Sequence, residues 1–96
     1  MKNKFYSSTE WKDLRQQILD RDDHKCFLCR CEDKLTVHHI LYINAGYQDF
    51  KLEPLNLITL CPSCHYKIHK MCYNFKLLHT LRYERPLQYQ FILDNV

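Results

Sequence analysis

The sequence predicts a small α+β domain with an N-terminal helix, a two-stranded hairpin and a metal-binding helix. Apolar residues recur at helical spacing near the N-terminus, and two short runs rich in apolar and β-branched residues flank a long loop. Two Cys-x-x-Cys pairs enclose these runs. Because the chain has 96 residues, we expect a single domain, 1–96, with a motif core at about 24–72 and a C-terminal segment at 73–96.

The N-terminal helix is predicted from its start signals and its apolar spacing. Ser7 can cap the helix, and Glu10 three residues later completes a capping box. Tyr6 and Trp11 are placed to pack as a hydrophobic staple, and the helix should run to about Arg21. The apolar stripe is more typical of a core-facing surface than of a binding surface, and it consists of Trp11, Leu14, Ile18 and Leu19.

Two short strands and a second helix are predicted in the middle of the chain. Residues 35–40 and 57–60 carry β-branched and apolar side chains, which favours a two-stranded hairpin. Residues 41–55 contain the single glycine and should form a long irregular loop, and loops of this length usually have a function. Pro62 suits the first turn of a helix. That helix should carry along one side Cys64, His65, Ile68, His69 and Cys72.

The C-terminal segment has weaker patterns. Cys72, just before it, is expected to be a buried free thiol. Residues 75–83 can continue as a helix, which Pro86 ends. Residues 87–93 partly alternate between apolar and polar side chains, and this favours a terminal strand or an extended arm.

Charge and composition narrow the class of protein. The formal net charge is +3, and basic residues outnumber acidic ones in the last third of the chain. This distribution suits a phosphate backbone, although on charge alone an ordinary solvated surface is the better explanation. The sequence shows no signal-like apolar run at its start and no segment long enough to span a bilayer. We therefore expect a soluble, cytoplasmic protein that does not bind a membrane.

Six cysteines in a short chain indicate either a disulfide framework or a metal site. The pairs Cys26-x2-Cys29 and Cys61-x2-Cys64 have ligand spacing, and intracellular thiols stay reduced. A tetrahedral structural Zn²⁺ site is therefore predicted at these four cysteines. Cys31 is an alternative to Cys29, and Cys29 is preferred because it completes the two-residue spacing.

Four histidines and one asparagine lie where a structural zinc site does not need them. A lone histidine is usually structural, but His65 and His69 are i and i+4, so a helix stacks them where they can bind one metal ion. His38 and His39 point to opposite faces of an ideal strand, which predicts that one coordinates a metal and the other activates water. Asn56 closes the loop and can keep the base in its orientation.

Together these motifs resemble the HNH endonuclease family, which has the ββα-metal fold. The resemblance covers about residues 7–70 and leaves the last part of the chain uncovered. The combination of motifs is far more specific than either cysteine pair alone. The matching segments are Trp11-Lys12-x2-Arg15, Arg21-Asp22, Cys26-x2-Cys29, Val37-His38-His39-Ile40, Asn56-Leu57-Ile58-Thr59-Leu60-Cys61 and Cys64-His65-x3-His69.

The resemblance implies a role for each matching residue. His38 would be the first metal ligand and His39 the general base, while Asn56 would tether the loop and orient His39. His65 and His69 would complete the site of a catalytic divalent ion, Mg²⁺, Mn²⁺, Ni²⁺ or Zn²⁺. Many family members have a carboxylate where His38 stands, and a histidine there shifts the preference towards softer ions and away from Mg²⁺. The four cysteines would hold a separate structural zinc.

The expected function is metal-dependent hydrolysis of phosphodiester bonds in DNA. Because no recognition module is evident, cleavage should be weakly sequence-specific or limited to nicking, unless a protein partner or the C-terminal segment directs it. The alternative is a zinc-stapled nucleic-acid-binding module without catalysis. Contacts to phosphates, which position DNA without reading its bases, are expected from Lys67, Lys70, Lys76 and Arg82.

Overall fold

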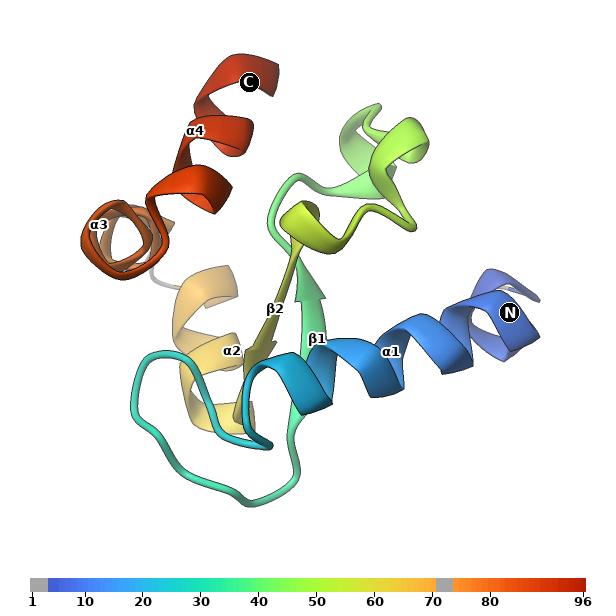
Figure 1. Ribbon diagram of the computed structural model, residues 1–96, viewed down its shortest axis with the longest axis horizontal. Helices are drawn as coiled ribbons and strands as arrows, with labels where there is room; N and C mark the ends of the chain where they lie inside the picture. The colour runs from blue at the N-terminus through green and yellow to red at the C-terminus, as the bar shows by residue number, and fades with distance from the viewer. Residues whose placement is uncertain (1–3, 71–73) are drawn as a thin grey trace.

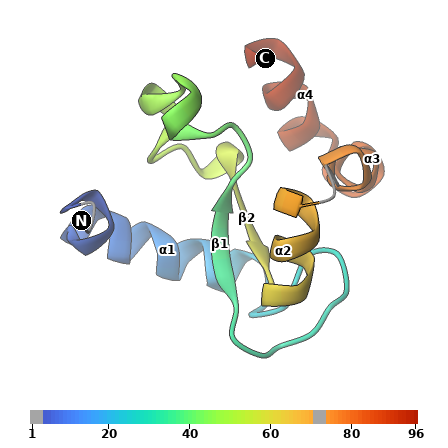
Figure 2. The same cartoon turned by 180° about the vertical axis from the view of Figure 1, so that it is seen from behind.

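The computed structural model describes residues 4–70 and 74–96, and these form an α+β fold with the two-stranded sheet near its centre (Figure 1). The predicted fold class is confirmed. Helices α1 and α2 lie on opposite sides of the sheet, as the front and back views show (Figures 1 and 2). Within the described ranges, no helix is long and apolar enough to cross a membrane. The elements are α1 (Thr9–Arg21), β1 (Thr36–His39), β2 (Leu57–Leu60), α2 (Pro62–Lys70), α3 (Asn74–Glu84) and α4 (Pro86–Asn95).

The first helix begins one residue later than its sequence predicts. Residues Lys4–Ser7 form a 3-10 turn, η1, so Ser8 rather than Ser7 is the N-cap. The Ser8 Oγ accepts a hydrogen bond from the Trp11 backbone N–H at 3.2 Å. The prediction that Ser7 caps the helix was wrong, because Ser7 is the last residue of η1 and the next serine, Ser8, takes the N-cap position. The predicted packing of Tyr6 on Trp11 is confirmed, with ring centroids 5.4 Å apart.

Strands β1 and β2 pair antiparallel, with His38 opposite Ile58 and His39 opposite Leu57. All four residues of β2 are buried, and three of them are apolar. Leu57 packs with the apolar residues of α1, whereas Ile58 belongs to the core group on the side of α2. The predicted hairpin is confirmed, and its two faces separate the neighbouring histidines.

The loop between the strands folds into short 3-10 turns. These are η2 (Ile43–Ala45), η3 (Gln48–Phe50) and η4 (Pro54–Asn56). Gly46 ends η2 with a φ of 101°, a left-handed conformation that glycine adopts without steric cost. The loop therefore returns to the sheet as a packed segment, and Asn56 is fully buried where it enters β2.

The last segment is a helix, so the predicted strand or arm at its sequence position was wrong. Pro86 occupies the first turn of α4, and Gln88 and Ile92, one turn apart, are both buried. Leu87 and Leu93 stay exposed, so the apparent alternation of residue types did not report burial. The two buried residues, Gln88 and Ile92, have the i, i+4 spacing of a helix, and the structure follows this spacing rather than the alternation.

A buried ion-pair network joins the C-terminal helices to the rest of the molecule. The Asp22 carboxylate is 1% exposed and pairs with Arg21 Nε at 2.8 Å and with Arg85 Nη2 at 2.7 Å. It also accepts a hydrogen bond from the Thr59 backbone N–H at 3.0 Å. Burial raises the pKa of Asp22, but the two arginines and the Thr59 N–H lower it overall. The carboxylate therefore links α1, β2 and the start of α4.

Candidate active site and metal centre

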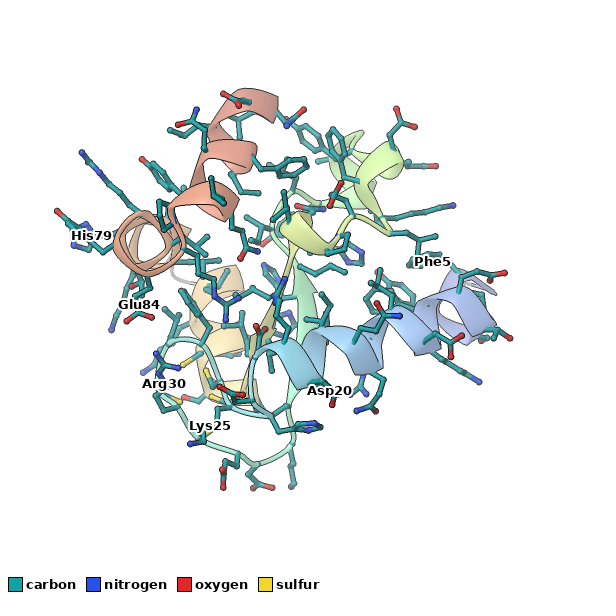
Figure 3. The ribbon with its side chains drawn as sticks, viewed as in Figure 1. Phe5, Asp20, Lys25, Arg30, His79 and Glu84 are labelled. Carbon is teal, nitrogen blue, oxygen red and sulfur yellow. The ribbon has the colours of Figure 1, made fainter. Side chains whose placement is uncertain are left out.

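The first cysteine pair lies in a tight turn. The Cys26 N–H donates to the Cys31 carbonyl at 2.8 Å, and the Arg30 N–H donates to the Cys26 carbonyl at 2.9 Å. Arg30 has a φ of 69°, which lets the chain reverse here. Its guanidinium pairs with Glu84 at the end of α3 at 3.1 Å (Figure 3). The turn therefore brings Cys26 and Cys29 close together, and the Arg30–Glu84 ion pair connects the turn to α3.

The second pair lies where β2 passes into α2. The Cys64 N–H points at the Cys61 sulfur at 3.4 Å, and the His65 N–H donates to the Cys61 carbonyl at 2.9 Å. Pro62 begins the helix, whose N-terminal end favours a thiolate. The ligand atoms of the four predicted cysteines all lie within 4.8 Å of one another, and they come from Cys26, Cys29, Cys61 and Cys64.

These four sulfur atoms fit a tetrahedral metal ion. Zinc–thiolate bonds of about 2.3 Å place sulfurs roughly 3.8 Å apart, and the Cys29 and Cys61 sulfurs lie 3.4 Å apart. Burial raises the pKa of the Cys61 thiol, but the Cys64 N–H and the neighbouring thiols lower it to about 6 overall. One thiolate is therefore favoured before any metal binds, which suits a divalent cation.

Cys31, the predicted alternative to Cys29, lies beside the cluster. The Asp33 backbone N–H lowers the pKa of its thiol, but burial and contacts with the Cys61 and Cys29 thiols raise it to about 11. Cys29 is the residue that the four-sulfur group includes. Cys72, predicted as a buried thiol, lies outside the described residues.

His38 and His65 face each other on the α2 side of the sheet. Their ring centroids are 5.1 Å apart, and the Tyr42 ring lies 5.6 Å from that of His38. Imidazole nitrogens are suitable donors for divalent transition metals. The backbone of His69 lies one turn after His65 in α2, but its side chain is outside the described part of the chain. Two of the three predicted donors are thus brought together.

His39 lies on the other side of the sheet, against the start of α1. Its ring stacks on Trp11, with centroids 5.2 Å apart and an interplanar angle of 19°. The rings of Phe5 and Tyr6 each lie 6.2 Å away. The His39 Nε2 lies 3.0 Å from the Lys51 carbonyl oxygen in the loop. Aromatic contacts and one hydrogen bond therefore fix the ring.

The bond to Lys51 also sets which nitrogen of His39 carries the proton. A carbonyl oxygen only accepts, so Nε2 donates and Nδ1 is the acceptor of the neutral ring. Among the described residues, no other hydrogen bond of this ring is seen. Burial lowers the pKa of His39 and the Lys51 bond raises it by less, so the pKa falls below its ordinary value. The neutral form is favoured at neutral pH.

Asn56 fixes the loop at both ends. Its Oδ1 accepts from the Leu41 N–H at 2.7 Å, and its Nδ2 donates to the Leu41 carbonyl at 3.1 Å and the Phe50 carbonyl at 3.2 Å. Its own carbonyl accepts from the Ile40 N–H at 2.8 Å. Phe50 directly precedes Lys51, so the asparagine holds the segment whose carbonyl binds His39.

The histidines meet at one cavity beside β1. Its volume is about 320 Å³, and His38 and His39 line it together with His65. Tyr6 and Tyr42 are also part of the lining. The cavity therefore borders both neighbouring histidines of β1 and the histidine of α2.

Comparison with known proteins assigns the family. The sequence model of the HNH endonuclease family matches residues 26–71. A protein of Lactococcus phage SK1 named probable HNH endonuclease is 34% identical over 68 residues, which cover 66% of this chain and 72% of that protein. The chain belongs to the HNH endonuclease family. A Nostoc protein named Anaredoxin is 33% identical over 63 residues, covering 64% of this chain and 78% of that protein. No solved structure gives a significant match.

The predicted phosphate contacts of this HNH protein divide between two helices. Lys67 is exposed on α2, the helix that carries His65, and Lys70 belongs to the same helix. The side chain of Lys70 lies outside the described residues. Lys76 and Arg82 are exposed on α3, which packs against α4. Two of the four positions are therefore on the helix that carries His65, and two are on α3.

Sequence reasoning missed several residues that surround the HNH histidines. Lys51 contributes a backbone carbonyl, and residue type cannot signal such a role. Trp11 was assigned to the core, and it is buried there while it also stacks on His39. Tyr42 packs on His38 just beyond the end of β1. The position of this aromatic residue, three residues after His39, is the one sequence signal that could have indicated its role.

Proposed function

We propose that this protein is a metal-dependent DNA endonuclease in which His39 is the general base. The hydrogen bond between His39 Nε2 and the Lys51 carbonyl carries the proposal, because it leaves Nδ1 as the proton acceptor. His38 and His65 line the same cavity from the other side of β1. A base and a pair of metal ligands at one cavity support hydrolysis of a phosphodiester bond.

The proposed base has the protonation state that its task requires. His39 takes a proton from water that attacks the scissile phosphorus in line, and only the neutral ring can do so. Burial lowers the pKa of His39, which keeps the ring neutral at physiological pH. Stacking on Trp11 and the bond to Lys51 limit rotation of the ring, so Nδ1 keeps one direction.

Asn56 acts in this proposal as a positioning residue. It touches neither DNA nor metal but ties Phe50 to Leu41, and so holds the adjacent Lys51 carbonyl in reach of His39. An asparagine suits this position because one amide both donates and accepts. Loss of the side chain would leave buried backbone groups without partners and would release the loop.

Three histidines, His38, His65 and His69, would hold the catalytic divalent ion. Such an ion, when bound, neutralises charge that develops on the phosphate and on the leaving oxygen. Imidazole donors favour Zn²⁺, Ni²⁺ or Mn²⁺ over Mg²⁺. The cysteine cluster would hold a structural Zn²⁺, whose ligands join the first turn, β2 and α2.

DNA would be held by charge rather than by base contacts. Lys67, Lys70, Lys76 and Arg82 would bind phosphates, which gives affinity without sequence preference. Cleavage would therefore be weakly specific or limited to nicking, unless a protein partner directs it.

A second function, nucleic-acid binding without catalysis, is favoured by one observation. His39 is only 7% exposed, and aromatic rings surround it, so the path for water to Nδ1 is narrow. In this alternative the cysteine cluster staples a binding domain, and the histidines are dispensable. The relative named Anaredoxin shows that related chains do not all carry a nuclease name.

Plasmid nicking separates the two functions. Wild type, His39→Ala and His24→Ala would be compared with Mg²⁺, Mn²⁺, Ni²⁺ and Zn²⁺. His24 is the matched control because its exposed ring pairs only with Asp20, at 2.7 Å, within the described residues. The nuclease proposal expects nicking by wild type and His24→Ala and its loss in His39→Ala. A wild-type protein that binds plasmid but nicks it with none of these ions would support the second function.

A further inference from the structure

Gln88 on α4 is a buried amide whose contacts lie beside the candidate site. Its side chain is 3% exposed, although the family match ends before α4 begins. Its Nε2 donates to the Leu55 carbonyl at 3.0 Å and to the Leu57 carbonyl at 2.9 Å. Arg85 Nη1 lies 3.4 Å from its Oε1, which fixes the amide with its donors towards these carbonyls. Gln88 therefore holds the backbone on both sides of Asn56.

The contacts continue from Asn56 to His39 without a gap. The Asn56 side chain donates to the Phe50 carbonyl at 3.2 Å. The next residue, Lys51, accepts from His39 Nε2 at 3.0 Å. A displacement of the Asn56 backbone would therefore also move the Lys51 carbonyl, which orients the His39 ring.

The same helix touches this segment a second time. Phe91 packs edge-on against Phe50, with ring centroids 5.4 Å apart and an interplanar angle of 79°. Gln88 and Phe91 are three residues apart, so they project from neighbouring positions of one helical surface. One contact thus holds the residue before Lys51, and the other holds the backbone around Asn56.

We propose that Gln88 is a positioning residue for His39, and that it acts through Asn56 and the Lys51 carbonyl. The inference rests on the proposed function, since it assigns the C-terminal helix a part in orienting the general base. The helix would hold the loop in the one geometry in which Nε2 is the protonated nitrogen. A catalytic role is not assigned to Gln88, because it lines neither the cavity nor the cysteine cluster.

The test compares Gln88→Met with Gln90→Met in the zinc-loaded full chain. Both substitutions remove an amide from α4 and keep its length, but Gln90 is exposed, and within residues 4–70 and 74–96 its side chain bonds only to Asp94, at 2.8 Å. Nitrogen-15 NMR would report the tautomer of His39, and plasmid nicking would report kcat and KM. For Gln88→Met we expect loss of the single Nε2–H tautomer and a kcat about 10-fold lower with KM unchanged. Gln90→Met should match wild type in both readouts.

A purely structural Gln88 would lower stability and leave these readouts alone. If folded Gln88→Met kept the wild-type tautomer and kcat, the inference would be overturned. Should that variant fail to fold, Phe91→Leu tests the same link from its other contact, with the same two expected changes. A wild type that does not nick DNA would reject the proposed function, whereas the tautomer measurement would still decide whether Gln88 orients His39.

Discussion

The cysteine cluster and the histidine cavity are assembled in different ways. The cluster consists of two tight turns, each closed by hydrogen bonds between residues close in sequence, such as Cys26 with Cys31 and Cys61 with His65. The cavity takes its lining from η1, β1, the loop and α2. Its proposed base is oriented by a carbonyl from the loop. Loss of one cysteine should therefore abolish zinc binding and folding together. Single substitutions around the histidine cavity should instead lower activity by different amounts while the fold is kept.

The largest effect should follow loss of one cluster cysteine. Cys64→Ser removes a proposed zinc ligand at the junction of β2 and α2, and we expect loss of cooperative folding. Structural zinc contributes about 10–16 kcal/mol in small zinc-dependent peptides, comparable with the whole stability of a small domain. Zinc content and thermal unfolding would be measured, with Cys31→Ser as control, which should keep about one zinc per chain. Zinc loss from Cys31→Ser but not from Cys64→Ser would reverse the ligand assignment.

Substitution of His39 should instead separate chemistry from folding. His39→Ala leaves the cluster and the facing pair His38 and His65 in place, so fold, metal binding and DNA binding should survive. Single-turnover cleavage at saturating metal should fall by about 10²–10⁴-fold, the usual contribution of a general base. Added metal should not restore it. By contrast, His65→Ala should lose metal affinity and recover in part at high metal concentration.

The pH profile tests the same assignment. His39 acts as a base only when neutral, so cleavage should rise with pH through its pKa and then level off. Burial lowers that pKa below its ordinary value of 6.5, so the midpoint should lie below 6.5, and activity should be lost as the pH falls through it. A wild-type cleavage rate at saturating metal in His39→Ala would exclude His39 as the base.

The same contrast explains what the sequence could predict. The hairpin, the helix that begins at Pro62 and the four-cysteine group depend on spacing and short-range patterns, and the structure has them. α4 was missed because exposed Leu87 and Leu93 imitate an alternating strand. The Lys51 carbonyl and the Gln88 amide could not be predicted, because their roles depend on which segments meet in space.

A third effect concerns the network that ties the C-terminal helices to the core. Asp22→Asn removes the buried charge that faces Arg21 and Arg85, and we expect a loss of about 2–3 kcal/mol in unfolding free energy. This lies below the roughly 3–5 kcal/mol typical of fully buried pairs, because both arginines keep some solvent contact. Chemical denaturation would measure the loss, while the cysteine cluster should keep its zinc.

The pH dependence of stability gives the control for Asp22. Its pKa in the folded chain is lowered from the ordinary value of 3.8. The stabilisation should therefore be complete above the unfolded pKa and should disappear as the pH falls through the lower folded pKa. In Asp22→Asn this acid-dependent part should be absent. An equal acid dependence in both proteins would assign the stabilisation to other carboxylates.

The smallest effects should come from single basic residues on α2 and α3. Lys67 shares α2 with His65, whereas Arg82 lies on α3, which packs against α4 instead. Each would neutralise about one phosphate if it touches DNA, so each alanine substitution should lower the salt dependence of duplex binding by about one unit of slope. We expect this change for Lys67→Ala, with affinity reduced alike for unrelated duplex sequences. An unchanged slope for Arg82→Ala beside a reduced one for Lys67→Ala would confine the DNA-binding surface to α2, the helix that carries the proposed ligand His65.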